Sequence, residues 1–268
     1  MPGMSSRRHV FNFTKWYFDC VCNDGLAAVG YWTVLAWRGF SLTWQALSIW
    51  EHDRPALERS TLVGSDMPSR TEGRIAWSAP ALECSVTADV CQQPLALRLF
   101  QSSTGFVDWR CEAPLARVAL DVAGFATLRG LGYVERLDLT IPPWQLPIRE
   151  LRWGRWTDRD AAHSIVWIDW RGEKPHTWVF VDGVHAAAAE VHDDRVDLGT
   201  SVLTMACSKT LSSRALDQIV DRIPPLRAVV PASLLAVREV KWSSLGTWER
   251  RGESGIEGPA LHERVMLR

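Results

Sequence analysis

Apolar and polar residues alternate with a period of two through most of this sequence, which is the pattern of β-strands with one buried face. The clearest case is residues 15–22 (KWYFDCVC), where two aromatic residues and two cysteines fall on one side of an extended chain. Residues 23–25 (NDG) are a strong hairpin signal, and residues 30–37 (GYWTVLAW) then form the returning strand. The N-terminal part therefore predicts an antiparallel sheet built from hairpins.

The same alternation recurs in short segments that proline, glycine or polar residues separate. A first set ends near residue 124, and a second set begins with residues 132–139 and 148–156. Two successive sets of strands fit two β-barrels or one long wrapped sandwich. We favour two barrels, because closure of a barrel removes the strand edges that would otherwise be exposed. We place the domains at 1–124 and 125–268.

One segment has a different period. Residues 212–224 (SSRALDQIVDRIP) begin with serine, carry apolar residues at helical spacing and end at proline. The expected fold class is therefore all-β, with one short helix near 212–223.

Length and charge exclude several classes of protein. The 268 residues carry a formal net charge of −1, whereas a nucleic-acid-binding protein needs a basic face that gathers phosphates. We therefore expect no nucleic-acid partner. No run of about 18 apolar residues occurs, and no apolar segment follows the N-terminal arginines, so we expect neither a transmembrane segment nor a signal peptide. We predict a cytoplasmic protein and leave peripheral membrane contact and oligomeric state open.

Motifs for nucleotides, phosphates, catalytic zinc and nucleophile elbows are absent from the sequence. His185 and His192 lie near Asp193 and Asp194, but no ligand spacing repeats, so we expect solvated loops rather than a metal. The six cysteines are expected to be core thiols. The predicted protein has no cofactor and no metal, and its chemistry would rely on acid–base groups and shape.

Tryptophan is the compositional outlier, with 15 residues against three tyrosines. Each tryptophan buries roughly 200 Å² and needs a partner for its N–H group. The tryptophans either fill the core or line a pocket for an apolar small-molecule ligand, and the two uses are compatible.

Several strands combine apolar residues with one charged residue on the same face. These charged residues are Glu135, Arg155, Asp169 and Glu239. A charge on an inward face is costly unless it is paired. The alternatives are internal ion pairs, such as Glu135 with Arg155, or a cavity with polar groups at its floor. In the second case, burial of a carboxylate would make it a usable general acid near neutral pH.

The proline-rich stretch 142–147 (PPWQLP) cannot lie in a central strand. We interpret it as a rigid turn between the strands at 132–139 and 148–156, which would then be neighbours. Its alternative role is a lip that holds Trp144 at the mouth of a barrel.

Two stretches resemble a known group of proteins. Residues 15–25 (KWYFDCVCNDG), followed by a tryptophan-rich hairpin, resemble the start of the carotenoid 1,2-hydratase (hydroxyneurosporene synthase) group. Residues 130–135 (GLGYVE) resemble the G-x-x-Y-x-E motif of that group, of tocopherol cyclases and of lipocalin-like Diels–Alderases. The matching residues are Trp16, Tyr17, Asp19, Gly25, Tyr133 and Glu135.

The resemblance implies two tandem lipocalin-like (calycin) β-barrels and a pocket for a polyene or polyketide. It implies a cofactor-independent hydratase, isomerase or cyclase acting on an apolar isoprenoid or polyketide-like substrate. Glu135 would be the acid, and Tyr133 and Arg155 would position or stabilise charge. The substrate would contact Trp16, Trp144, Trp153, Trp167, Asp169 and Glu239. The alternatives are a non-catalytic lipid or isoprenoid binding protein of the same fold, and a structural protein whose tryptophans only fill the core.

Overall fold

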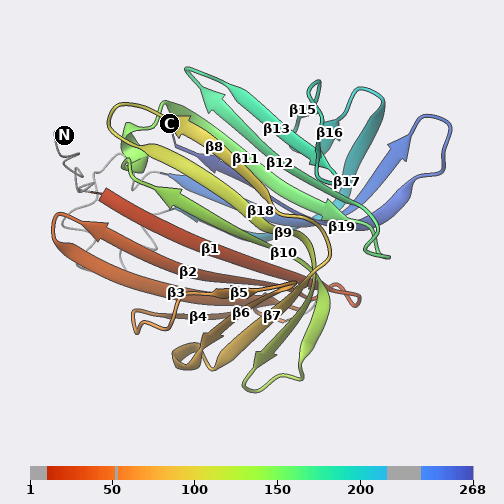
Figure 1. Ribbon diagram of the computed structural model, residues 1–268. Coiled ribbons are helices and arrows are strands. Elements are labelled where there is room, and N and C mark those ends of the chain that lie inside the picture. Colours follow the sequence, from red (N-terminus) through yellow and green to blue (C-terminus); the bar gives the residue numbers. More distant parts are fainter. Residues whose placement is uncertain (1–10, 52–53, 216–236, 268) are drawn as a thin grey trace. The chain divides into compact units, whose positions relative to one another are not determined.

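The computed structural model describes residues 11–51, 54–215 and 237–267, and strands make up nearly all of its regular structure (Figure 1). Among these residues, the only helical segments are the 3-10 turns η1 (Pro80–Leu82) and η2 (Pro143–Gln145). Within the same ranges, no helix is long and apolar enough to cross a membrane. The strands form two antiparallel sheets, which confirms the all-β prediction.

The chain divides into two compact units, each built around one sheet. The first unit comprises Met1–Val90, Pro94–Ala113 and Arg117–Pro143, and the second comprises Cys91–Gln93, Pro114–Ala116 and Trp144–Arg268. The expected boundary at 124/125 does not coincide with this division. The reason is that the strand following residue 124 hydrogen bonds to the N-terminal strand of the chain.

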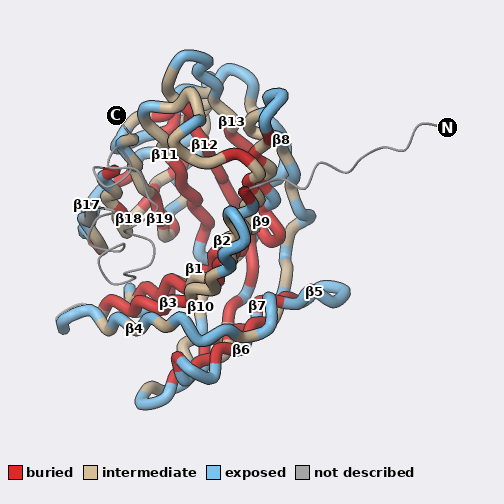
Figure 2. The backbone as a smooth tube through the Cα atoms, turned by 90° about the vertical axis from the view of Figure 1, so that its left-hand side faces the viewer, coloured by how far each residue is buried: buried red, intermediate tan, exposed pale blue. Residues whose placement is uncertain are grey.

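Over the described residues, the sheet of the first unit has the order β4-β3-β2-β1-β10-β9-β7-β6-β5, with β8 also paired to β9. Its strands are β1 (Phe11–Cys22), β2 (Ala27–Trp37), β3 (Phe40–Trp50), β4 (Leu57–Thr61), β5 (Ser69–Thr71), β6 (Arg74–Ala79), β7 (Cys84–Val90), β8 (Leu95–Gln101), β9 (Phe106–Val122) and β10 (Leu128–Leu139). Burial is concentrated in its central strands, whereas β4 and β5 are largely exposed or half-buried (Figure 2).

The hairpin predicted around residues 23–25 is confirmed. β1 and β2 are paired from Phe11 and Trp37 to Val21 and Ala27. Gly25 has a φ of +83°, a conformation that L side chains rarely adopt and that glycine reaches without strain.

The first sheet curls so that strands distant in the sheet order touch. Phe18 of β1 stacks on Trp77 of β6 with ring centroids 5.4 Å apart, and Trp16 stacks on Phe18 at 6.2 Å. A cavity beside Phe18 and Cys20 has a volume of only about 10 Å³. The concave side of this sheet is thus filled by side chains at that point, and the space left there holds at most one water molecule.

Over the described residues, the sheet of the second unit has the order β14-β13-β12-β11-β19-β18-β17-β16-β15. Its strands are β11 (Ile148–Thr157), β12 (Ser164–Gly172), β13 (His176–Val181), β14 (Val184–His185), β15 (Glu190–Val191), β16 (Arg195–Asp197), β17 (Ser201–Ala215), β18 (Arg238–Arg250) and β19 (Ile256–Met266). β17 continues through Ala215, so the predicted helix does not begin at Ser212. The rest of that prediction, residues 216–223, lies outside the described residues.

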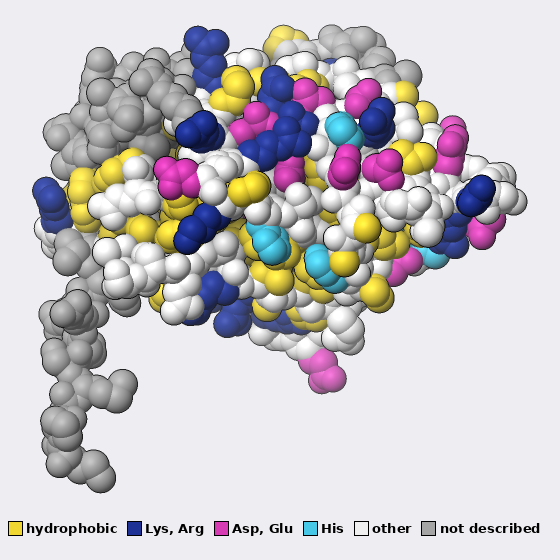
Figure 3. All heavy atoms as spheres, turned by 90° about the horizontal axis from the view of Figure 1, so that it is seen from above, with side chains coloured by type: hydrophobic (Ala, Val, Ile, Leu, Met, Phe, Trp, Pro, Cys, Tyr) yellow, Lys and Arg dark blue, Asp and Glu magenta, His cyan; other side chains and the backbone are white. Residues whose placement is uncertain are grey.

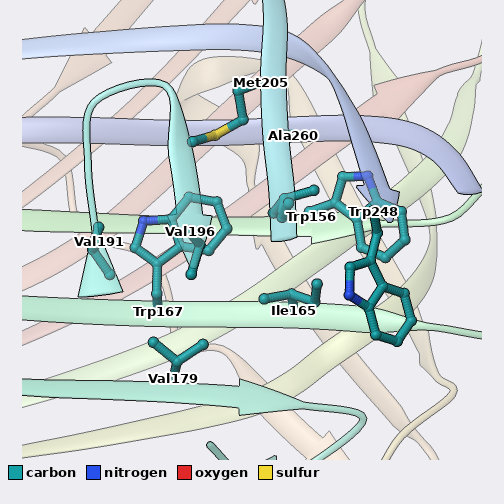
Figure 4. Close-up of a cluster of buried hydrophobic side chains, with 10 residues drawn as sticks. Trp156, Ile165, Trp167, Val179, Val191, Val196, Met205, Trp248 and Ala260 are labelled. Atoms are coloured by element: carbon teal, nitrogen blue, oxygen red, sulfur yellow. The ribbon is translucent and has the colours of Figure 1, made fainter. Parts of the chain in front are cut away.

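An apolar cluster fills the concave side of the second sheet (Figure 4). It contains Trp156, Ile165, Trp167, Val179, Val191, Val196, Leu203, Met205, Trp248 and Ala260. Trp156 and Trp248 pack edge to face with ring centroids 5.8 Å apart. Here tryptophan serves the core, which is one of the two uses that its abundance suggested.

His262 is a buried polar residue of the second sheet. Its ring stacks on Trp242, which lies directly opposite in β18, with ring centroids 5.1 Å apart. Gly154 lies opposite it in β11, where a Cβ atom would stand 2.7 Å from His262 Cβ and 2.2 Å from the Trp167 ring. Burial, only partly opposed by Asp193, lowers the pKa of His262 to about 4.

We predict that Gly154→Ala destabilises the protein, because the new methyl group meets the rigid ring of Trp167. Overpacking of this kind costs about 1–3 kcal/mol in the free energy of unfolding. Chemical denaturation measures the change. Gly64→Ala is the control, since its methyl group meets only Thr43 at ordinary contact distance. Equal stability of the two variants would contradict the close packing at Gly154.

We predict that His262 makes the protein less stable as pH falls. The ordinary pKa is 6.5 and the folded pKa is about 4, so between these values the unfolded chain binds the proton more readily. The free energy of unfolding should lose on the order of 3 kcal/mol across this window through this residue alone. The measurement is the difference between wild type and His262→Gln from pH 7.5 to pH 4. Parallel curves for the two proteins would show that burial does not shift this histidine.

Candidate active site

Glu135 is a carboxylate buried on one face of the first sheet. It lies in β10 between β1 and β9, and only 4% of the residue is exposed. The residue directly opposite it in β1 is Tyr17. Because opposed residues share a face, Glu135 lies on the side of the sheet away from the stack of Trp16, Phe18 and Trp77.

Three donors converge on the Glu135 carboxylate. The indole N–H of Trp109 donates to Oε2 at 2.7 Å, and the hydroxyl of Tyr133 donates to the same oxygen at 2.8 Å. The ammonium group of Lys15 lies 3.2 Å from Oε1. All three partners are donors, so both carboxylate oxygens act as acceptors here.

Aromatic rings extend from this carboxylate across β1, β2 and β3. Tyr17 packs edge to face against Tyr133 at 6.1 Å and against Tyr31 at 5.4 Å, and Tyr31 packs against Trp44 at 5.9 Å. All three tyrosines of the chain therefore gather here. We call Lys15, Tyr17, Tyr31, Trp44, Trp109, Tyr133 and Glu135 the Glu135 cluster.

Cys111 is a buried thiol beside the Glu135 cluster. Burial is the main reason that its pKa lies well above the ordinary value, and a hydrogen bond with Tyr133 opposes that effect. The nearby carboxylates of Glu135, Glu112 and Asp19 raise the pKa further. The thiol is protonated at neutral pH and does not act as a nucleophile.

The Glu135 cluster suits proton transfer and stabilisation of positive charge. A buried carboxylate can accept a proton from carbon or water, and it attracts a cation more strongly than it would in water. Electron-rich faces of tyrosine and tryptophan also attract cations. Lys15 is 23% exposed, so it links the carboxylate to more accessible surface.

The structure brings together only some of the predicted site residues of the first unit. Tyr133 and Glu135 are in contact, as the shared motif suggested. Trp16 lies on the opposite face, beside Phe18, so it does not share a wall with Glu135. Trp144 lies within η2 and is half-buried.

The expectation that Glu135 and Arg155 lie on neighbouring strands is wrong. β10 is hydrogen-bonded to β1 and β9, whereas β11, which carries Arg155, is hydrogen-bonded to β12 and β19 in the other sheet. The segment between β10 and β11 therefore connects two sheets and does not form a hairpin turn.

A second group of buried charged residues lies in the second unit and includes Arg155, with Trp153 on the same strand. Arg155 is fully buried, and Trp153 lies with its ring centroid 5.8 Å from the ammonium group of Lys241. Lys241 is 2% exposed and forms ion pairs with Glu263 and, at 3.9 Å, with Glu239. Three predicted residues, Trp153, Arg155 and Glu239, thus share one face of β11 and β18.

Trp167 and Asp169 lie on the other face of that sheet. Trp167 is opposite Gly154 and joins the apolar cluster, so Trp153 and Trp167 do not form two walls of one pocket. Asp169 accepts hydrogen bonds from Arg171 at 2.6 Å and Thr177 at 2.8 Å, so it is a paired structural carboxylate.

Sequence reasoning missed Lys15, Trp109, Tyr31 and Trp44. Lys15 and Tyr17 alternate with the apolar residues of 15–22, so they read as the outward face of an ordinary surface strand. Only the register of β1 against β10 shows that this face carries the partners of Glu135.

The charged surface is mixed in sign. On the face that Figure 3 presents, Lys and Arg side chains are interspersed with Asp and Glu. Among the described residues, ion pairs such as Arg264 with Asp193 and Arg152 with Glu150 also join charges of opposite sign. That face therefore lacks the single-sign basic patch typical of nucleic-acid binding.

No protein-family model matches the chain, and no curated protein matches it in sequence. Several solved structures match it in fold, among them the following three. CghA in complex with Sch210972 has a TM-score of 0.56 at 11% identity, covering 96% of this chain and 88% of CghA. Kievitone hydratase from Nectria haematococca has a TM-score of 0.53 at 10% identity, with coverages of 96% and 90%. A protein described as AttH-like, from Nitrosomonas europaea, has a TM-score of 0.52 at 13% identity, with coverages of 94% and 92%.

These similarities extend over nearly the whole of each chain, and at such low identity they establish the fold and nothing more. The chain has the lipocalin-like architecture of these proteins, with two curled antiparallel sheets. The resemblance to the hydratase and cyclase group is therefore supported at the level of fold.

We predict that Lys15 and Glu135 are strongly coupled in stability. Lys15→Met leaves a buried carboxylate without its counter-charge and should lower the free energy of unfolding by about 1–3 kcal/mol. Combination with Glu135→Gln should cost less than the sum of the single changes. A double-mutant cycle by chemical denaturation measures the coupling.

The matched control is the surface pair Arg74 and Asp89, in which both side chains are more than half exposed. The cycle with Arg74→Met and Asp89→Asn should give a smaller coupling, because water screens an exposed pair. Equal couplings in the two cycles would mean that burial does not strengthen the Lys15–Glu135 pair.

Proposed function

We propose that this protein is a cofactor-independent enzyme of the hydratase, isomerase or cyclase type, acting on an apolar isoprenoid or polyketide-like substrate. The observation that carries the proposal is the Glu135 carboxylate, buried among aromatic rings and held by Trp109, Tyr133 and Lys15. A buried charge is costly to maintain, so an aromatic surface that retains one is a candidate for chemistry.

We assign Glu135 the role of proton acceptor and counter-charge. The sequence alone suggested an acid, but the three groups around the carboxylate are all donors, and a set of acceptor oxygens suits a proton acceptor. In a hydration it would take one proton from the attacking water and then return it, as the carboxylic acid, to the adjacent carbon of the double bond. In an isomerisation or cyclisation it would remove a proton from carbon, next to a positive charge that the rings of Tyr17, Tyr31 and Trp44 stabilise.

Tyr133 positions this carboxylate, and Lys15 offers a route for the proton. The Tyr133 hydroxyl fixes the same oxygen that Trp109 holds, which leaves Oε1 with Lys15. After proton transfer, the Lys15 ammonium group would release one proton to solvent through its more accessible side, and the neutral amine would then take the proton from the Glu135 carboxyl group. Arg155 would act in the second unit, where its fully buried charge shares a face with Trp153.

The structural relatives agree with this class of reaction without specifying it. One is named a hydratase, and another was determined with Sch210972. The alternative is a non-catalytic lipid or isoprenoid binding protein of the same fold, which would use the aromatic surface and not need the carboxylate.

We predict that Glu135→Gln abolishes turnover of an acyclic isoprenoid polyene by the purified protein. Loss of a proton-transferring group should lower the rate by about 10²-fold or more. Incubation in D₂O followed by mass spectrometry distinguishes the reactions. A hydratase adds the elements of D₂O, whereas an isomerase or cyclase exchanges deuterium at carbon without adding water.

Glu112→Gln is the control, because Glu112 is a second buried glutamate of the same unit and pairs with Arg70. It should leave turnover close to that of the wild type. Native mass spectrometry of both variants, searching for a co-purifying lipid, tests the alternative. If wild type and Glu135→Gln bind lipid equally and neither consumes the polyene, the protein is a non-catalytic binding protein and the enzyme proposal is wrong.

A further inference from the structure

The pairing of β17 with β18 contains a bulge. Ala206 is opposite Leu245 and Lys209 is opposite Ser243, so residues 207 and 208 together stand opposite Ser244. A bulge of this kind turns a side chain out of the regular alternation and is common beside active sites.

The bulge starts a chain of hydrogen bonds that leads inward from the surface. The hydroxyls of Ser208 and Ser244 are 2.7 Å apart, and Ser244 Oγ is 2.8 Å from His262 Nε2. Ser208 is exposed, whereas Ser244 and His262 are 6% and 5% exposed. One accessible hydroxyl is thus connected to a buried imidazole through a second hydroxyl.

The direction of this chain follows from the state of His262. Because burial lowers its pKa to about 4, the imidazole is neutral at neutral pH and one ring nitrogen accepts a hydrogen bond. In the tautomer that carries its proton on Nδ1, the Ser244 hydroxyl donates to Nε2, and Ser244 Oγ accepts from the Ser208 hydroxyl. The His262 ring stacks on Trp242, and the lack of a side chain at Gly154 leaves room for His262 beside it.

We propose that Ser208 is the nucleophile of an acyl-transfer site, with Ser244 passing its proton to His262. This arrangement is that of a serine nucleophile with a histidine base, extended by one hydroxyl. The site lies in the second unit and uses none of the Glu135 cluster, so it is independent of the function proposed above.

The reaction is balanced within these residues and the substrate. Ser208 Oγ forms a bond to the acyl carbon, its proton moves to Ser244 Oγ, and the Ser244 proton moves to Nε2. The bond from the acyl carbon to the leaving oxygen or sulfur then breaks, and the leaving group takes a proton from the imidazolium through the Ser244 hydroxyl alone, because Ser208 Oγ is now an ester oxygen. Water attacks the acyl-serine and gives a proton to His262 through Ser244. The bond from the acyl carbon to Ser208 Oγ breaks, Ser208 takes that proton back through Ser244, and the acid is released.

The state of the base also indicates the class of substrate. A buried imidazole that binds its proton weakly is a weak base, so it activates the serine hydroxyl only modestly and needs a reactive acyl carbon. The site therefore fits activated acyl compounds, such as aryl esters and thioesters, rather than amides.

An alkyl fluorophosphonate tests the site, because it phosphonylates an activated serine and releases fluoride. The full-length protein is labelled and the modified serine is located by peptide mass spectrometry. Ser208 should be labelled, whereas Ser213, an exposed serine of the same strand, should not. Ser208→Ala should abolish the labelling, and Ser213→Ala should leave its rate unchanged.

Ser244 and His262 are positioning residues that act through Ser208, so their test needs a conservative variant. Ser244→Ala should slow labelling by about 10²-fold. Ser244→Thr keeps the hydroxyl and should restore most of the rate, which a purely structural effect of the alanine would not require. His262→Gln should slow labelling as Ser244→Ala does.

Labelling of Ser208 no faster than that of Ser213 would overturn the proposal. An unchanged rate in Ser244→Ala would also overturn it, as would Ser244→Thr remaining as slow as Ser244→Ala. Thermal unfolding of each variant confirms that the rates refer to folded protein.

Discussion

The pairing of β1 with β10 is the constraint on which the first unit depends. It joins segments far apart in the chain, as in the hydrogen bond from Thr14 to Asp138, which are 124 residues apart. Its register places Tyr17 opposite Glu135 and Asp19 opposite Tyr133. A shift by one residue would turn the Tyr17 face of β1 away from the carboxylate and bring the face of Trp16 and Phe18 to it.

Both faces of these central strands are buried, and they serve different purposes. One face packs Phe18 and Trp77 into an apolar stack, and the other carries Glu135 with its three donors. The second sheet repeats this division, with Trp167 in the apolar cluster and Lys241 paired to Glu263 on the opposite face. Such strands do not show the simple alternation of a one-sided sheet, because charged residues lie on a face that is also buried.

Local features could be predicted from the sequence, and distant pairings could not. The hairpin at Gly25 follows from turn chemistry within a few residues, and the sequence also predicted the all-β class. Glu135 and Tyr133 stood out because they share one motif on one strand. Lys15 and Trp109 come from other strands, and no local pattern encodes their register. Trp153 and Trp167 were expected to line one pocket for the same reason, because the register between their strands could not be read from the sequence.

The two units are interleaved along the chain. The second unit includes Cys91–Gln93 and Pro114–Ala116, which come from the N-terminal half, and Ser164 hydrogen bonds to Gln92. A gene fragment that begins at Trp144 would therefore encode an incomplete second unit. Transfer of this unit as a separate module would also need Cys91–Gln93 and the part of β9 at Pro114–Ala116.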